Sequence, residues 1–489
     1  MRQIFKAIGW IALAGFTFAG VAHAQMGGGM GGGGMGGGGH GGGHHRGAGQ
    51  RGQGAPGGQP QGQPGPILPP AAIPLAMRLT GAVVVNGTSQ TLSHAPLVAN
   101  KPDYSAVFVS RGGSVTLDTM QIESHGVASL LSDTRTSGLN SALLVNSGSS
   151  ATVTGGNIAT TGPGGNGAYA DGRGTRLVVD GAVITTEATG AYGLEISDAA
   201  TLDAKEATVT TASDHAPALA GENGGAMTLT GGHYTTGGPD SPAIAVSNDL
   251  NGTGITAAAA KSDGLAVAGA HMVTLSDSHL NGDRYALRLT GDTPVAAPPL
   301  MPAKPGAGVI PAEAMLAQPV SDGATVTIDG GELDGRSALF YVSNSRAHIT
   351  LSNVGLKSGS GVLVKAAAGQ QGELGRNGGI AIIDARNQIL TGDMATDVIS
   401  RIRLNLGGNS HFTGLATHQV DVALDATSTW VLTGDCGVGL LSIDGVTSPN
   451  QISQIDSQGH TLSYDDTRNA WLGGKTYALK GGGTLKPGL

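Results

Sequence analysis

An internal repeat of about 25 residues is the feature that most constrains the fold of this chain. One series of markers is spaced by 26, 25 and 25 positions: Ile158, Ile184, Val209 and Tyr234. Each of these residues is followed two positions later by Thr. A second series is spaced by 25 positions at every step: Tyr169, Leu194, Leu219 and Ile244. Because both series keep one period, we expect the same structural unit to recur along this part of the chain.

Short phrases with alternating apolar residues mark the strands of this unit. They include the pairs Val107 and Val109, Leu143 and Val145, Leu194 and Ile196, Ile244 and Val246, and Leu287 and Leu289. Residues two apart in a strand point to the same side, so each pair is expected to face a common core. Glu195 and Arg288, which lie between the members of two such pairs, are then expected to face solvent.

Short strands at a fixed period, separated by Gly, Asn and Asp, predict an all-β fold, a right-handed single-stranded parallel β-helix. One coil cannot bury its own apolar side, so the coils must stack around a continuous core. We assign residues 75–445 to about 15 such coils, a rod roughly 70 Å long. Residues 446–489 form a cap-like tail. The rival fold, an array of β-sandwiches, has hairpin turns that would not preserve the repeat phase through four units.

Composition excludes several classes of protein. The chain has 27 Lys and Arg against 35 Asp and Glu, a formal net charge of −8 at pH 7. This acidic balance argues against nucleic acid as a partner. Glycine accounts for 85 of the 489 residues, which disfavours a helical bundle. With a single Cys, the chain has no intramolecular disulfide.

The N-terminal part of the sequence is typical of an exported protein. Residues 1–24 contain Arg2 and Lys6, a short apolar run and the site Ala22-His23-Ala24, which together predict a signal peptide. The mature chain has no other apolar run long enough to span a membrane. Residues 25–74, rich in Gly, Met, His and Pro, have too few apolar side chains to fold and predict a disordered leader.

The leader also contains weak candidate ligands for a soft or borderline metal. The imidazole candidates are His40, His44 and His45. Nothing in the sequence fixes their geometry, and Gly-rich tracts often carry such residues without binding a metal. We therefore predict a flexible spacer and assign neither a metal nor a cofactor.

A second segment interrupts the repeat. Residues 292–323 contain seven prolines, which cannot donate the backbone hydrogen bonds that a β-ladder needs. We predict an extended loop that leaves the rod. It is either an inert disordered insertion, the reading we favour, or a recognition loop, whose deletion should weaken surface binding without unfolding the coils.

The C-terminal third resembles the passenger domains of pertactin-like autotransporters. In that family a Thr-Trp-x-apolar-Thr-Gly phrase, followed by Val and Leu, closes the β-helix. The matching residues are Thr429, Trp430, Leu432, Thr433, Gly434, Val438 and Leu440. With the predicted signal peptide and the Gly-punctuated repeats, the resemblance extends over roughly residues 75–480. It implies that Trp430 lies close to the closing coils, together with Trp471 of the tail.

The sequence also differs from this family in one respect. Such passengers normally continue into a membrane barrel, but only 44 residues follow Gly445 (489 minus 445), too few for a barrel. The expectation is a passenger domain that lacks its translocator, with a separate outer-membrane translocator as a possible partner. The expected location is outside the inner membrane of a Gram-negative bacterium: secreted, at the cell surface or in the periplasm.

Function follows from these expectations. We predict a structural or adhesive rod with a glycan, a matrix or a cell-surface ligand as partner, and no catalytic residues. The alternative is a polysaccharide hydrolase or lyase, since several β-helix families act on carbohydrates. Its candidate residues lie far apart in the repeat and do not follow the order found in polygalacturonase-like enzymes. They are Ser124-His125-Gly126, Asp465-Asp466 and the Arg401–Arg403 stretch.

Cys436 has no basic neighbour in sequence and is expected to be an inert, small apolar side chain.

Overall fold

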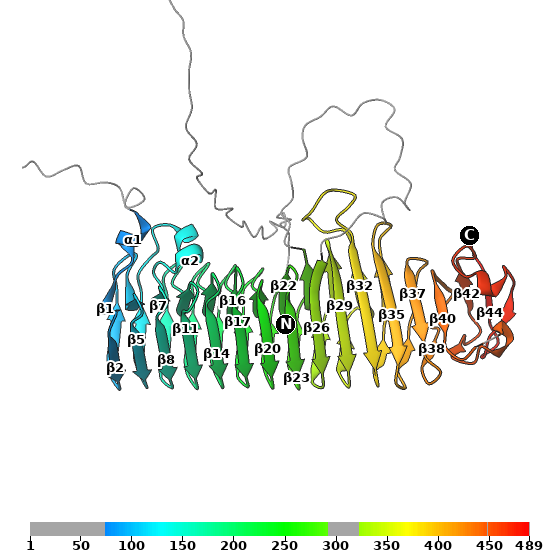
Figure 1. Cartoon of the computed structure of the whole chain (residues 1–489), viewed down its shortest axis with the longest axis horizontal. Coiled ribbons are helices and arrows are strands. Elements are labelled where there is room, and N and C mark those ends of the chain that lie inside the picture. The colour runs from blue at the N-terminus through cyan, green and yellow to red at the C-terminus, as the bar shows by residue number, and fades with distance from the viewer. Residues whose placement is uncertain (1–73, 292–321, 447, 489) are drawn as a thin grey trace, which may run out of the picture.

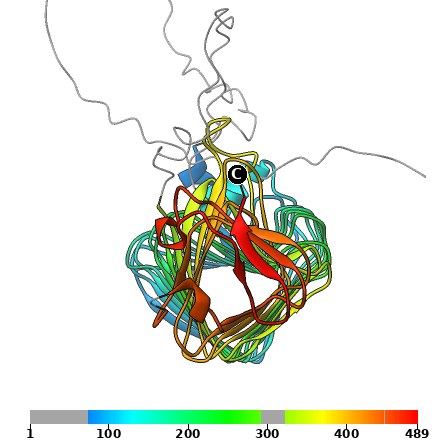
Figure 2. The ribbon, with the colours of Figure 1, turned by 90° about the vertical axis from the view of Figure 1, so that its right-hand side faces the viewer.

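The computed structural model describes residues 74–291, 322–446 and 448–488. These residues form a parallel β-helix, as predicted, and Figure 1 shows the coils stacked side by side along one axis. Viewed along that axis in Figure 2, the coils form a three-sided outline. The predicted signal peptide, almost all of the leader, and most of the Pro-rich insertion lie outside the described residues.

Three parallel sheets, here called A, B and C, form the sides of the rod. Sheet A contains β1 (Gly81–Asn86), β4 (Ser105–Ser110), β7 (Leu143–Asn146), β10 (Ala168–Asp171), β13 (Leu194–Ser197), β16 (Leu219–Gly221), β19 (Ile244–Val246), β22 (Leu265–Ala268), β25 (Tyr285–Thr290), β28 (Ala338–Ser343), β31 (Val362–Ala366) and β34 (Asp393–Thr396). Sheet B contains β2 (Ser89–Ser93), β5 (Ser114–Asp118), β8 (Ser150–Thr154), β11 (Arg176–Asp180), β14 (Thr201–Lys205), β17 (Ala226–Thr230), β20 (Asp249–Thr253), β23 (Met272–Ser276), β26 (Asp322–Asp329), β29 (Ser345–Ser352), β32 (Gly379–Arg386), β35 (Arg401–Gly407), β37 (Val420–Leu424) and β40 (Leu441–Ile443). Sheet C contains β3 (Pro96–Ala99), β6 (Gln121–Ser124), β9 (Asn157–Thr160), β12 (Val183–Thr186), β15 (Thr208–Thr211), β18 (His233–Thr236), β21 (Thr256–Ala259), β24 (His279–Gly282), β27 (Glu332–Gly335) and β30 (Gly355–Ser358).

Two smaller sheets continue the rod toward the C-terminus and take the places of sheets C and A in the chain order. Sheet D contains β33 (Ile389–Thr391), β36 (His411–Thr413), β38 (Thr429–Val431) and β41 (Ile455–Asp456). Sheet E contains β39 (Cys436–Val438), β42 (Thr461–Tyr464), β44 (Thr484–Pro487) and β43 (Tyr477–Ala478). Parallel pairing therefore continues beyond residue 445, and the antiparallel pair of β43 with β44 ends the rod.

Helical segments are short. They are α1 (Leu75–Arg78), α2 (Leu131–Ser137), and the 3-10 turns η2 (Pro449–Gln451) and η3 (Ala470–Leu472). Both α1 and α2 lie on the upper side of the rod in Figure 1. No helix in the described part of the chain is long and apolar enough to span a membrane.

The first marker series forms one column of the core. Ile158, Ile184, Val209 and Tyr234 pair in register on successive strands of sheet C, and all four side chains are buried. The Thr two positions after each marker is also buried, and its Oγ1 donates to the carbonyl oxygen five residues later. The repeated Thr therefore satisfies a buried carbonyl at the corner that leads to sheet A.

The prediction that the second marker series forms one column is wrong for its first residue, Tyr169. Leu194, Leu219 and Ile244 share a column, but Tyr169 pairs with Glu195, one position away from that column. This coil contains 26 residues, as the pairing of Ala168 with Leu194 shows, so a spacing of 25 reaches the opposite side of the strand. The five predicted pairs of core residues in sheet A are all buried, as expected.

The corner that follows sheet B has the same form in eleven successive coils, from His94 to Asn387. Ten of these connections lead to sheet C, and the last leads to sheet D. Each connection has two residues, and the first has a positive φ. At Gly181, for example, φ is 66°, and the amide N–H donates to the carbonyl of Lys205 in the next coil at 2.9 Å. The left-handed residue thus turns the chain and also continues the hydrogen-bond ladder.

Two residues of the predicted insertion belong to a strand. Asp322 and Gly323 begin β26, which pairs with β29 across the ladder of sheet B. At the other end of the predicted β-helix, residues 75–78 form α1 and precede the first coil.

We predict that Trp430→Ala lowers the free energy of unfolding by about 3 to 5 kcal/mol. The Trp430 ring is fully buried, lies 5.6 Å from the Phe412 ring, and its Nε1 donates to the carbonyl of Gly414 at 3.0 Å. Urea denaturation followed by circular dichroism measures the loss. The matched control is Trp471→Ala, because Trp471 is 38% exposed and its removal should cost much less. Equal losses in the two variants would show that Trp430 does not support the C-terminal coils.

Candidate functional site: the outer face of sheet A

One column of side chains runs along the outer face of sheet A and changes character from coil to coil. In register, it contains Leu144, Tyr169, Glu195, Ala220, Ala245, Ala266, Arg288, Tyr341 and Lys365. Strands bring these residues together although they are spread over more than 200 positions of the chain. The column alternates in sequence with the apolar core pairs, so each member points away from the core.

Glu195 corrects one prediction. It lies on the outer side of its strand, but it is fully buried and does not face solvent. Its Oε2 accepts a hydrogen bond from Asn166 Nδ2 at 2.9 Å, and Asn166 Oδ1 accepts one from the amide N–H of Tyr192, also at 2.9 Å. The other oxygen, Oε1, is buried with no hydrogen-bond partner among the described residues.

Helix α2 and Tyr192 help to cover this end of the column. The Arg135 guanidinium of α2 lies 5.9 Å from the centre of the Tyr192 ring. Tyr169 donates through its hydroxyl to the carbonyl of Arg135 at 3.2 Å. The helix ends at Gly138, whose φ of 65° returns the chain toward β7. The connection between β6 and β7 is therefore folded against the outer face of sheet A.

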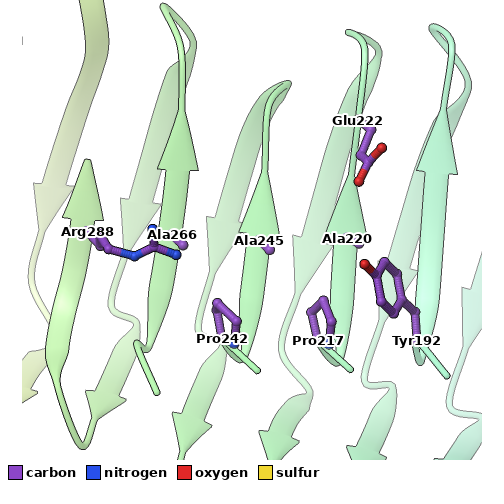
Figure 3. Close-up of a pocket in the computed structure, with 8 residues that line it drawn as sticks. All are labelled: Tyr192, Pro217, Ala220, Glu222, Pro242, Ala245, Ala266 and Arg288. Atoms are coloured by element: carbon purple, nitrogen blue, oxygen red, sulfur yellow. The ribbon is translucent and has the colours of Figure 1, made fainter. Parts of the chain in front are cut away.

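A small pocket lies beside this covered region, and Figure 3 shows the residues that line it. They are Tyr192, Pro217, Ala220, Glu222, Pro242, Ala245, Ala266 and Arg288, here called the outer strip. In Figure 3 the three alanines follow one another on neighbouring strands, with the two prolines beside them at the strand starts. Tyr192 and Glu222 lie at one end, and Arg288 lies at the other. The outer strip therefore has an apolar middle and polar ends.

The cationic end is held by ion pairs. Arg288 Nε donates to Asp263 Oδ2 at 2.6 Å, and the Asp263 side chain is fully buried. Arg284 also contacts Asp263, at 3.2 Å, and forms a second ion pair with Asp240 at 3.0 Å. This network fixes the Arg288 side chain and compensates its charge. Tyr285, on the same strand as Arg288, stacks on Tyr341 of the next strand, β28, with ring centres 4.7 Å apart and an interplanar angle of 10°.

The acidic end has carboxyl groups with raised pKa values. Burial raises the pKa of Glu195 well above its usual range, and the nearby Glu222 adds to this effect while Arg135 opposes it. Burial also raises the pKa of Glu222. It raises the pKa of Asp171 to about 6, with a further contribution from Asp198. These groups therefore tend to keep their protons at a higher pH than ordinary carboxyl groups do.

The enzyme candidates taken from the sequence are not brought together. His125 follows β6 near the N-terminal end, where Nδ1 lies 2.9 Å from Thr161 Oγ1. Arg401 and Arg403 lie on β35 of sheet B. This strand is ten strands along sheet B from β5, the strand that directly precedes β6 and His125 in the chain. Asp465 follows β42, and its Oδ1 accepts a hydrogen bond from Thr467 Oγ1 at 2.6 Å. Burial raises the pKa of Asp465, but hydrogen bonds from Thr467 and Arg468 outweigh this effect, and the pKa lies below its ordinary value. These residues form no shared site.

The residues of the C-terminal motif differ in how deeply they are buried. Trp430, Leu432 and Val438 are buried, Thr429, Gly434 and Leu440 are partly buried, and Thr433 is exposed. Trp430 pairs with Phe412 on one side and with Ile455 on the other, so it lies inside the stack and not on the last coil. Trp471 lies further toward the end and donates through Nε1 to the carbonyl of Leu441 at 3.1 Å.

Cys436 is a free thiol that is partly buried. Burial raises its pKa to about 11, so it is protonated at neutral pH and a poor nucleophile. The candidate metal ligands His40, His44 and His45 lie outside the described residues. Among the residues that are described, no group of three or more His, Cys, Asp or Glu side chains could hold a metal ion.

Comparisons with known proteins give no family for this chain. No family model matches its sequence, and no curated protein is significantly similar to it. The site must therefore be interpreted from its own geometry and chemistry.

We predict that Glu195→Gln reduces the pH dependence of stability. Because the pKa of Glu195 is raised above its ordinary value of 4.5, its stabilising contribution is present below that pH and is lost as the pH rises. The melting temperature of the wild type should therefore fall relative to that of the variant as the pH rises above 4.5. Gln keeps the oxygen that accepts from Asn166 but cannot ionise. A difference that stays constant as the pH rises would contradict a raised pKa for the buried Glu195 carboxyl group.

Proposed function

We propose that this chain is an exported rod that acts as a structural or adhesive protein outside the inner membrane. The observation that carries the proposal is the stacking of long parallel sheets, one with fourteen strands, into a single stiff β-helix with extended sides. Such a scaffold holds successive coils at regular intervals along one axis, which suits several weak contacts with an extended surface. The predicted signal peptide supports export.

A closer relation to pertactin-like autotransporter passengers is part of this proposal. The Thr-Trp phrase at residues 429–434 and its place within the C-terminal coils support it. An outer-membrane translocator is the partner that this relation would require. The ligand would be a glycan, a matrix component or another cell-surface molecule.

A carbohydrate-active enzyme is the second candidate, and one observation favours it. Glu195 and Glu222, two carboxyl groups with raised pKa values, lie next to the pocket of the outer strip. A raised pKa lets a carboxyl group hold its proton at a higher pH than usual, as a general acid must. Glu222 lines the pocket directly, whereas Glu195 lies beneath its covering residues.

One set of experiments tests the proposed function. Cells that express the full chain are fractionated, and intact cells are treated with protease; we expect the protein outside the cytoplasm. Beads coated with the purified chain should adhere to surfaces that carry polysaccharide or matrix, above beads coated with an unrelated acidic protein. A cytoplasmic location, or adhesion equal to the control, would contradict the proposal.

The same purified chain separates the two candidates. Incubation with polysaccharides should release no reducing ends and no unsaturated products if the chain is a rod without catalytic activity. Product release that is lost in Glu222→Gln would instead establish the enzyme.

A further inference from the structure

The first coil leaves one end of the rod open. Strands β1, β2 and β3 each pair with only one strand among the described residues: β4, β5 and β6, respectively. Figure 1 shows β1 and β2 at this end of the stack. The other edges of the three strands present unpaired backbone N–H and C=O groups on all three sides of the rod. Free edges of this kind are templates for pairing with another chain.

The core is also uncovered at this end. Each side of the first coil contributes a core side chain that is only partly buried: Val83, Leu92 and Leu97. Their register partners in the next coil are fully buried: Val107, Leu117 and Ile122. Since the residue types are alike in the two coils, the lower burial comes from the position at the end of the stack. This end therefore combines free strand edges with exposed apolar surface.

Charged side chains do not protect these edges. Natural edge strands are commonly guarded by charges, most often Lys. Between Arg78 and Lys101, however, the sequence contains no Asp, Glu, Lys or Arg, although 13% of the whole chain is charged. Pro96, at the start of β3, is the only residue of the three strands without a backbone N–H. A second copy of the chain can therefore meet this end without placing like charges against each other, despite the net charge of −8.

The chain that precedes the first coil cannot pair with all three free edges. Helix α1 is held at the upper side of the rod, because Arg78 forms an ion pair with Asp103 at 2.8 Å and another with Asp133 of α2. Residues 67–73 come before it and lie outside the described residues. Seven residues span at most about 25 Å when fully extended, and two of these are proline. The three free strands have six, five and four residues, so this segment is too short to pair with all of them.

The C-terminal end of the rod does not match the open end. There β43 pairs antiparallel with β44, and Trp471 donates through Nε1 to the carbonyl of Leu441 in the last strand of sheet B. The N-terminal end of a second copy, in contrast, has the same three-sided outline and the same three free edges. A contact between two such ends is self-complementary, has two-fold symmetry and is closed at two copies.

We propose that the first coil is a docking surface for a second copy of this chain, and that two rods join through their N-terminal ends. Because the two ends face each other, the strands of the two first coils pair antiparallel. The joint buries the partly exposed core side chains Val83, Leu92 and Leu97 of both copies. The dimer is one longer rod with a C-terminal end at each tip. The inference does not depend on the proposed adhesive function, but an adhesive rod of this form would be bivalent.

A matched pair of substitutions tests the joint. Val83→Asp places a carboxylate at the open end of the core, where a dimer would bury it. Val183→Asp makes the same change at an exposed position of β12, three strands further along sheet C than β3. Sedimentation over a range of concentrations gives the oligomeric state of the purified full chain and of both variants, and small-angle X-ray scattering gives the length of the particles. Circular dichroism and melting verify that the coils of both variants are intact.

We expect the wild type to form dimers roughly twice as long as the monomer, as an end-to-end contact requires. Val83→Asp should raise the dissociation constant about tenfold or more, and Val183→Asp should leave it within about twofold, as for changes inside and outside an interface. If Val83→Asp does not fold, amide hydrogen exchange of the wild type gives the answer. Strands β1, β2 and β3 should exchange faster on dilution, because their free N–H groups are bonded only in the dimer.

Four results would overturn the inference. They are a wild type that stays monomeric at every concentration, equal dissociation constants of the two variants, a dimer no longer than the monomer, and exchange in the first three strands that does not change on dilution. A dimer of unchanged length would show that the rods associate through their sides. These results leave the adhesive function standing, because the bead assay measures it separately.

Discussion

The structure depends on one left-handed residue in each coil. Every connection from sheet B to sheet C, and the one at Asn387 that leads from sheet B to sheet D, has two residues, and the first has a positive φ. A fixed turn of this kind keeps the strands of sheets B and C in constant register, because a one-residue change would move every core side chain to the outer face. Gly, Asn and Asp occur often at this position since they tolerate the conformation, although His94, Thr119 and Glu206 adopt it too.

The lengths of the connections between strands vary most at the corners that flank sheet A. The connection from sheet C to sheet A ranges from two residues between β24 and β25 to eighteen between β6 and β7, where α2 is found. Longer connections fold over the outer face of sheet A, bury Glu195 and Tyr169, and form a boundary of the outer strip. The constant corner thus maintains the stack, and the variable corners give one face its chemistry.

The sequence was sufficient to predict the core but not the outer face. Alternation of apolar residues identifies which side of a strand faces the stack, and it placed Leu194 and Ile196 correctly. It does not reveal what lies over the other side, so Glu195 was expected in solvent. Nor did a fixed spacing of 25 detect the coil of 26 residues that turns Tyr169 outward. The repeated Pro-Ala-x-Ala phrase at residues 217–220 and 242–245 is the sequence signal that marks the strip.

The most direct measurement of the central claim is the stability of two variants at Gly181. Its φ is 66°, and an added Cβ would meet no other atom within 4 Å, so any loss reports the backbone conformation itself. By urea denaturation, Gly181→Val should lower the free energy of unfolding by about 1 to 3 kcal/mol, and Gly181→Asn should lower it clearly less. Equal stability of the wild type and both variants would contradict a left-handed residue at this corner.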